Sequence, residues 1–258
     1  MKVSPGDKKV ILELLSSCNL NCAHCFYRQS SNFHSPDFLP KKGLLSLIDG
    51  FSKKGINKLV LTGGEPTLHP DFLEISRYAM SKIDRVTLCT NGYIVNKKLK
   101  EQVLELNFAT YTVSIDSHIK EVHDDFRGRS GALDKTLEFL EELNKKGRHT
   151  SIHIVIHRNN FEHIEETIKF CKKLSPEIVV GSIYYDKLKI NQGEIDTYNK
   201  NLEKFRQKYI NDPYITLVGF EPYCSSMDCP DQKQIFMVNR KGQAVTCYWK
   251  KGGGQILN

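Results

Sequence analysis

Short runs of β-branched residues alternate with helical patterns along most of the chain, and this alternation limits the fold more than any other feature. The strand-like runs cover residues 10–15, 58–61, 85–89, 109–115, 150–156 and 178–184, and the helical patterns between them cover residues 40–54, 71–82, 96–106, 132–146 and 161–174. Regular alternation indicates βα units, a parallel sheet and right-handed connections. Six units are too few for a closed eight-stranded barrel. Residues 1–186 are therefore predicted to form an open, partial (β/α)6 barrel of the α/β class.

The pattern changes after this core. Residues 187–212 read as a linker with one polar helix, and residues 213–258 read as a small, loop-rich extension that contains three more cysteines. Within the extension, residues 234–239 and 243–246 predict the two strands of a β-hairpin, with residues 240–242 as its turn.

The composition argues against several classes of protein. The chain has 258 residues and a formal net charge of +7, but no apolar run approaches the roughly 20 residues of a membrane span. Its lysines lie on helical faces without interleaved aromatic residues, so we expect a solvated surface rather than nucleic-acid binding. Residues 1–9 lack the apolar segment of a secretion signal. Eight cysteines in such a chain indicate metal binding in a reducing compartment, the cytoplasm.

Three cysteines follow the first strand-like run within one short segment. Cys18, Cys22 and Cys25 have the spacing C-x3-C-x2-C, with no fourth cysteine nearby. Three thiolates bind three irons of a [4Fe–4S] cluster and leave the fourth iron open to another ligand. The alternative is a Cys3His zinc site that includes His24, although zinc ligands usually come as two separated pairs.

Glycines and polar residues follow the next two strands, at the edge where a parallel sheet collects its functional groups. Gly63 and Gly64 permit a sharp turn and a close approach to a ligand, and Pro66 fixes the exit of the chain. Glu65 supplies a carboxylate that can pair with an ammonium group. Asn91 lies in an Asn-Gly sequence that is also simply a good turn.

The fourth strand ends in a hydroxyl and a carboxylate. Alternation along a strand places Ser114 and Asp116 on the same face, where they can bind ribose hydroxyls or a carboxylate. Arg127 follows in the segment His-Asp-Asp-Phe-Arg-Gly, and a guanidinium can grip a carboxylate through two hydrogen bonds.

Together these motifs resemble the radical S-adenosylmethionine (radical SAM) superfamily. The resemblance rests on the cysteine spacing, on Gly-Gly-Glu-Pro at 63–66, on Thr-Asn-Gly at 90–92 and on the stretch 113–128. It implies a [4Fe–4S] cluster on Cys18, Cys22 and Cys25, whose open iron is chelated by the amino and carboxylate groups of S-adenosylmethionine (SAM). The implied cofactor-binding residues are Gly63, Gly64, Glu65 and Pro66 near the amino group, Ser114 and Arg127 at the carboxylate, Asp116 near the ribose, His24 or Tyr27 against the adenine, Ser182 on the strand that lines the adenine pocket, and Asn91 in the Thr-Asn-Gly segment.

The last cysteines are similar in spacing to the opening of SPASM and twitch domains, which bind auxiliary iron–sulfur clusters. Twelve residues separate Cys229 from Gly242, and four separate Gly242 from Cys247. The resemblance implies one auxiliary cluster on Cys224, Cys229 and Cys247. The downstream cysteines of a full SPASM domain are absent from this sequence. A zinc site, a missing end that supplies further ligands, and Cys224 as a free thiol that donates a hydrogen atom to a substrate radical are the alternatives.

The resemblance implies reductive cleavage of SAM to a 5′-deoxyadenosyl radical that abstracts a hydrogen from the substrate. We expect a peptide substrate, modified by crosslinking, oxidation or epimerisation, and an electron donor of the flavodoxin or ferredoxin type. Oxidation or epimerisation of a small molecule such as an aminosugar or aminocyclitol is the second hypothesis. The third, a non-catalytic iron–sulfur or zinc protein, explains the cysteines but leaves the polar residues at successive strand ends unexplained.

Overall fold

One sheet runs through the protein, and its central strands are all parallel. The computed structural model describes residues 8–25, 38–182, 192–218 and 235–245. Within them the strand order is β7-β6-β5-β4-β3-β2-β1-β8-β9, so the sheet curves without closing. Its strands are β1 (Lys9–Glu13), β2 (Lys58–Thr62), β3 (Arg85–Thr90), β4 (Thr110–Ser114), β5 (Thr150–Ile156), β6 (Glu177–Ser182), β7 (Ile215–Val218), β8 (Ile235–Val238) and β9 (Ala244–Val245).

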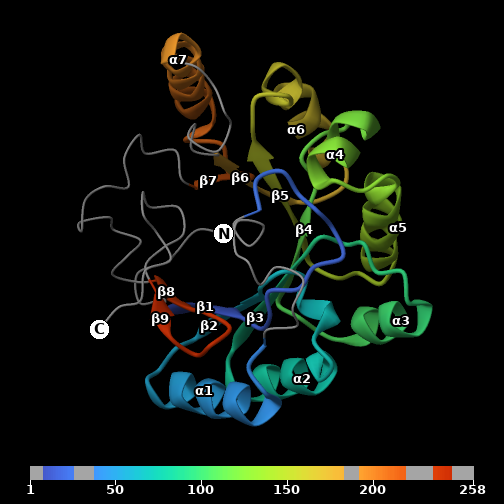
Figure 1. Ribbon diagram of the computed structural model, residues 1–258, viewed down its shortest axis with the longest axis vertical. Helices are drawn as coiled ribbons and strands as arrows, with labels where there is room; N and C mark the ends of the chain where they lie inside the picture. The colour runs from blue at the N-terminus through green and yellow to red at the C-terminus, as the bar shows by residue number, and fades with distance from the viewer. Residues whose placement is uncertain (1–7, 26–37, 183–191, 219–234, 246–258) are drawn as a thin grey trace.

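The helices connect successive parallel strands and cover the outer side of the sheet, where they form an arc around the strands (Figure 1). They are α1 (Lys41–Lys53), η2 (Pro66–Leu68), α2 (Phe72–Lys82), α3 (Lys97–Glu105), α4 (Lys120–Arg127), α5 (Ala132–Lys145), η3 (Phe161–His163), α6 (Ile164–Lys172) and α7 (Gln192–Tyr209). Each crossover helix returns the chain to the start of the next parallel strand, so the ends of the strands collect at one edge.

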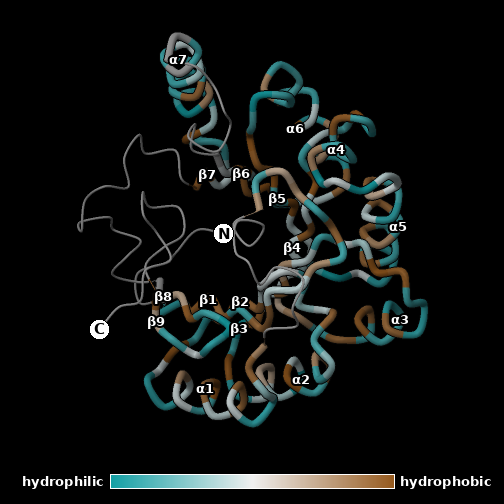
Figure 2. The backbone as a smooth tube through the Cα atoms, in the orientation of Figure 1, coloured by the Kyte–Doolittle hydropathy of each residue, from teal (hydrophilic) through white to brown (hydrophobic). Residues whose placement is uncertain are grey.

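The two faces of the sheet differ in chemistry. The outward side chains are apolar and form the main core with the helices; among them, Leu59, Leu88, Tyr111, Ile152 and Phe139 of α5 are almost fully buried. Each such side chain contributes roughly 1.5–3 kcal/mol through burial. Figure 2 shows the matching pattern, with hydrophobic stretches along the strands and mixed hydropathy along the helices.

The inward side chains are largely polar. They include Thr87, Thr112, Ser151 and Ser114 with its neighbour in register, His153. The first three are more than nine-tenths buried and do not belong to the apolar core. We call the space enclosed by these inward side chains the lumen. A polar lumen is unusual, because the interior of a barrel without a ligand site is ordinarily packed with branched apolar side chains.

The predicted open α/β barrel is confirmed, and so is the C-terminal hairpin, in which Met237 pairs with Val245. Its first strand, β8, also pairs in parallel with β1, and β7 pairs with β6, so both ends of the sheet are longer than predicted. The division at residues 186 and 212 into core, linker and extension stays a prediction. Among the described residues, no helix has the length and hydropathy needed to cross a bilayer.

Candidate functional site

The cysteine segment, residues 14–25, leaves the C-terminal end of β1 and is first held by the loop after β2. Gly64 N donates to Leu15 O (2.8 Å) and Glu65 N donates to Ser17 O (2.8 Å). Only glycine fits at position 64, because the Cβ atom of any other residue would lie 2.1 Å from Ser17 O. The two glycines that were predicted to approach a cofactor therefore approach the backbone of the cysteine segment, and their contact with SAM stays a prediction.

The second half of the segment is held by the end of α4. Asn21 N donates to Arg127 O (3.0 Å), and Ala23 N donates to Phe126 O (2.8 Å). Gly128 follows with φ +63°, and a Cβ at this position would meet Asn21 O at 2.4 Å. Only glycine adopts this backbone conformation easily while leaving room for the neighbouring carbonyl.

The three cysteines cluster together with Leu20 and Ala132. Burial raises the pKa of the Cys18 thiol to about 12, and the nearby Glu65 carboxylate adds to this rise. Asn91 Nδ2 donates a hydrogen bond to Cys18 Sγ at 3.6 Å. Asn91, which follows the third strand, therefore contacts the cysteine segment. Bound metal ions would supply the positive charge that such buried thiols need to ionise.

Among the described residues, no three Cys, His, Asp or Glu side chains converge on one point that would hold a single metal ion. A [4Fe–4S] cluster makes a different demand, because each thiolate binds a separate iron. None of the cysteines within the described ranges forms a disulfide.

Glu65 is fully buried and is bound on both oxygens. Oε1 accepts hydrogen bonds from the backbone and hydroxyl of Thr67 and from Thr90 Oγ1, and Oε2 accepts one from Asn91 N (2.8 Å). Burial raises the pKa of Glu65, and these hydrogen bonds oppose the rise. The carboxylate therefore ties η2 to the end of β3. Its predicted pairing with an ammonium group would use lone pairs that these donors leave available.

Arg127 and Asp116 form a buried ion pair beside the cysteines. Arg127 Nε donates to Asp116 Oδ2 at 2.5 Å, and the two side chains are 7% and 0% exposed. Burial alone raises the pKa of Asp116, but the opposing electrostatic interactions, of which that with the Arg127 guanidinium is the largest, together hold that pKa below its ordinary value. Arg127 Nη1 points at Cys22 Sγ (3.8 Å), whereas Nη2 is buried with no hydrogen-bond partner among the described residues.

Three aromatic rings stack next to this pair. His24 lies on Phe126 with ring centroids 4.6 Å apart, and Phe126 lies on His157 at 3.5 Å. Burial lowers the pKa of His24 to about 3 and that of His157 to about 4, so both imidazoles are neutral near pH 7. His24 Nδ1 and His157 Nε2 are also buried without a described hydrogen-bond partner. Since Phe126 covers one face of His24, the predicted contact with adenine requires the other face.

The remaining predicted residues are placed only in part. Ser114 is half-buried at the end of β4, and Pro66 is buried at the start of η2. Ser182 ends β6, but its side chain lies outside the described part of the chain. Tyr27, Cys224, Cys229 and Cys247 lie outside the described residues, so their predicted roles are untested.

Two further residues complete the site: Asn160, which the resemblance to the radical SAM superfamily matches only loosely, and His157, which the resemblance does not include. Asn160 is fully buried; its amide donates to Asp116 O (2.7 Å) and Val155 O (2.9 Å), while its oxygen accepts from His157 N (2.8 Å). It thereby fixes the loops after β4 and β5 to each other. His157 carried no usable signal, since its stacking partner Phe126 is distant in the sequence.

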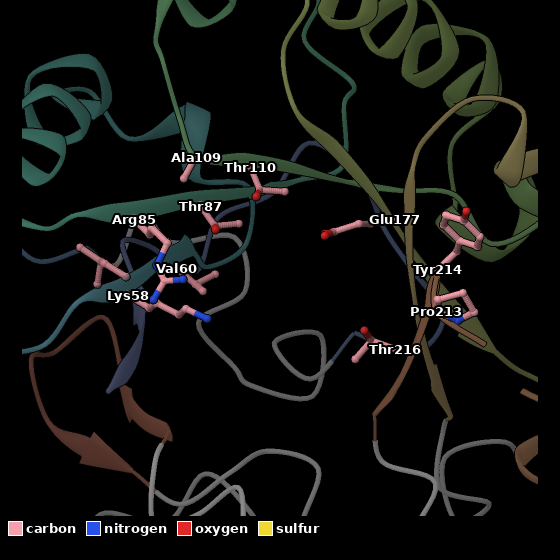
Figure 3. A pocket seen from close by; sticks show the side chains of 11 residues that line it. Lys58, Val60, Arg85, Thr87, Ala109, Thr110, Glu177, Pro213, Tyr214 and Thr216 are labelled. Atoms are coloured by element: carbon pink, nitrogen blue, oxygen red, sulfur yellow. The ribbon is translucent and has the colours of Figure 1, made fainter. Parts of the chain in front are cut away.

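A pocket of about 350 Å³ opens into the lumen at the N-terminal ends of the strands (Figure 3). Lys58 and Arg85, the first residues of β2 and β3, line it on one side, and Glu177 at the start of β6 lines it opposite (Figure 3). Three threonines contribute hydroxyl groups. This end of the lumen is therefore polar and charged, and it lies at the opposite ends of the strands from the cysteine segment.

The open barrel and the three-cysteine segment at its strand ends define the class of protein. The family model of the Radical SAM superfamily matches residues 12–171 of the chain. The chain therefore belongs to the radical SAM superfamily. Membership implies a [4Fe–4S] cluster and SAM as cofactors.

Individual relatives differ in what they do. The chain is 35% identical over 169 residues to an AdoMet-dependent heme synthase of Methanosarcina barkeri, covering 66% of this chain and 48% of the relative. It is 30% identical over 155 residues to the mycofactocin maturase MftC of Mycobacterium tuberculosis, covering 60% and 39%. The structure of Streptococcus suis SuiB bound to its precursor peptide SuiA matches with a TM-score of 0.72 at 16% identity, covering 98% of this chain and 62% of that one. The chain thus spans about half the length or less of these curated relatives.

The side chains present suit the implied cofactors. Three thiols from one segment match the ligand set of a cluster with an open iron. Arg127 Nη2, which has no hydrogen-bond partner within the described ranges, is a buried cationic donor next to these thiols, and such a donor binds a carboxylate strongly.

Proposed function

We propose that this protein cleaves SAM reductively and removes a hydrogen atom from a peptide. A [4Fe–4S] cluster and SAM bound at this site would supply the electron for that cleavage and the group that abstracts the hydrogen atom. Cys18, Cys22 and Cys25 hold the cluster. Arg127 Nη2 orients the SAM carboxylate, and Asp116 holds Arg127 in place. The reducing conditions that this chemistry needs agree with the cytoplasm and with a flavodoxin or ferredoxin as electron donor.

The polar lumen is the observation that carries the choice of a peptide. Thr87, Thr112 and Ser151 offer buried hydroxyl groups from three neighbouring strands, and His153 lies at the level of Ser114. Peptide amides and carbonyls can exchange hydrogen bonds with such hydroxyl groups, two of which, Thr112 Oγ1 and Ser151 Oγ, lie 3.4 Å apart, whereas the face of a flat apolar ring offers them no partner. The maturase MftC and the peptide-bound SuiB support the same choice.

A tetrapyrrole is the second candidate. The relatives at up to 35% identity include heme synthases and an Fe-coproporphyrin III synthase. Lys58 and Arg85 at the N-terminal end of the lumen offer positive charge for the carboxylates of such a ring.

Cleavage of SAM is the first test. The protein is reconstituted with iron and sulfide without oxygen, mixed with SAM and dithionite, and assayed for 5′-deoxyadenosine. We expect the product from the wild type and from Cys171→Ala, which removes a buried core thiol on α6, and at least a hundredfold less from Cys22→Ala. A wild type that binds about four irons but forms no 5′-deoxyadenosine would contradict the proposal.

The substrate class is tested by following the abstracted atom. Fully deuterated peptides from a bacterial protein digest should transfer deuterium to 5′-deoxyadenosine, which mass spectrometry detects. Fe-coproporphyrin III, followed by its absorbance, tests the second candidate. Consumption of the porphyrin without deuterium transfer from peptides would replace the first proposal with the second.

A further inference from the structure

The Arg127 guanidinium lies between a carboxylate and a cysteine of the cluster segment. Nε faces Asp116 Oδ2 at 2.5 Å, and Nη1 faces Cys22 Sγ at 3.8 Å, within the range of a hydrogen bond to sulfur. The side chain is only 7% exposed, so water screens this contact weakly. The positive end of the ion pair is therefore directed at the sulfur.

Several elements fix this geometry. Asp116 Oδ1 accepts from Val155 N (2.9 Å), and Asp116 O accepts from the Asn160 amide, so the carboxylate has little freedom. Arg127 is the last residue of α4, and its own carbonyl accepts from Asn21 N in the cysteine segment. Both the guanidinium and the loop that carries Cys22 are therefore held by the same turn of backbone.

Hydrogen bonds to the sulfurs, nearby charge and solvent exposure set the potential of an iron–sulfur cluster. Reduction adds one electron, here from dithionite, and makes the cluster and its thiolates more negative. A buried cation that donates a hydrogen bond to one thiolate stabilises this reduced form more than the oxidised form. Removing the cation should therefore shift the reduction potential to more negative values.

We propose that Arg127 raises the reduction potential of the cluster through its contact with Cys22, in addition to any contact with SAM. The inference rests on the proposed function only in assuming that Cys18, Cys22 and Cys25 bind a [4Fe–4S] cluster. The contact joins two side chains of this protein, so its effect on the cluster does not require SAM.

The test is a redox titration of the reconstituted protein without SAM, followed by the EPR signal of the reduced cluster. We expect a more negative midpoint for Arg127→Gln, a smaller shift for Arg127→Lys, which keeps the charge, and no shift for Arg129→Gln. Arg129 is the matched control, because it is exposed and bonds Tyr93. A midpoint for Arg127→Gln equal to that of the wild type, at equal iron content, would overturn the proposal.

A second measurement covers the case in which Arg127→Gln fails to hold the cluster. Wild-type protein carrying ¹⁵N-labelled arginine should show hyperfine coupling between a guanidinium nitrogen and the reduced cluster in pulsed EPR. The coupling should vanish in Arg127→Lys and persist in Arg129→Gln. Its absence from the wild type would refute the contact.

These outcomes are separable from those of the proposed function. A shifted midpoint without 5′-deoxyadenosine would leave the inference standing and remove the enzyme activity. Formation of 5′-deoxyadenosine with an unshifted midpoint would support the enzyme activity and overturn the inference.

Discussion

Gly64 and Glu65 show how single residues of this site act through neighbours rather than alone. Glycine was expected here because a ligand approaches closely, and a close approach is observed, but to the carbonyl of Ser17. Glu65 was expected to face an ammonium group, and it accepts hydrogen bonds from Thr67, Thr90 and Asn91. Gly64 and Glu65 therefore hold the backbone of the cysteine segment in place.

We predict that Gly64→Ala destabilises the protein by about 2–4 kcal/mol, because the new methyl group would overlap backbone that cannot move freely. The free energy of unfolding from urea titration measures this. Gly50→Ala is the control: it lies within α1, and its Cβ would meet nothing within 4 Å. This substitution should be neutral or stabilising by about 0.5–1 kcal/mol. Equal effects of the two substitutions would refute the explanation.

At the scale of elements, α4 is the feature that the sequence reading missed. Its segment was read as a ligand-binding motif, and the helix places Phe126 against His157 and Arg127 against Asp116. The signals were present: Gly128 ends the helix in a left-handed conformation, and Asp124 accepts from Gly131 N and Leu133 N at the start of α5. A helix of eight residues gives little periodicity, so the interpretation as a motif prevailed.

The stacking of α4 on the loop after β5 predicts a loss of stability in acid. Burial lowers the pKa of His157 from its ordinary 6.5 to about 4, so below pH 6.5 the unfolded chain binds a proton that the folded chain excludes. Stability is therefore full above pH 6.5 and falls as the pH drops toward 4, by up to about 2 kcal/mol at pH 5 for this one residue.

Urea titrations at pH 7 and pH 5 measure this loss. We expect a smaller loss in His157→Gln and a wild-type loss in His149→Gln, which alters an exposed histidine. An undiminished loss in His157→Gln would assign the acid sensitivity to other groups.

For the whole molecule, the sheet decides which distant segments become neighbours. β1 leads into the cysteine segment. It pairs with β2 on one edge and, on the other edge, with β8, the first strand of the C-terminal hairpin. The segment predicted to carry auxiliary cysteines therefore contributes a strand that pairs with the strand leading into the first cysteine set. The auxiliary cluster stays a prediction, because Cys224, Cys229 and Cys247 lie outside the described residues.

We predict about eight irons per chain after anaerobic reconstitution, falling to about four when Cys18, Cys22 and Cys25 are all changed to Ala. Changing Cys224, Cys229 and Cys247 instead should also leave about four. Iron and sulfide analysis gives the numbers. About four irons in the wild type, and none after the first set of substitutions, would remove the auxiliary cluster and leave Cys224 as a candidate hydrogen donor.

Apart from α4, β7 and the short helices η2 and η3, the order of strands and helices, the open parallel sheet and the cysteine segment followed from the sequence by itself, because periodicity and short motifs are local properties. The residues at the strand ends could also be named in advance, since parallel strands collect them at one edge. Only the tertiary structure placed Arg127 on Cys22, which lies 105 residues earlier, closed the backbone of the cysteine segment over Gly64 and paired β8 with β1. Such contacts depend on how far each loop reaches and on what burial leaves room for, and no local pattern of residues records either.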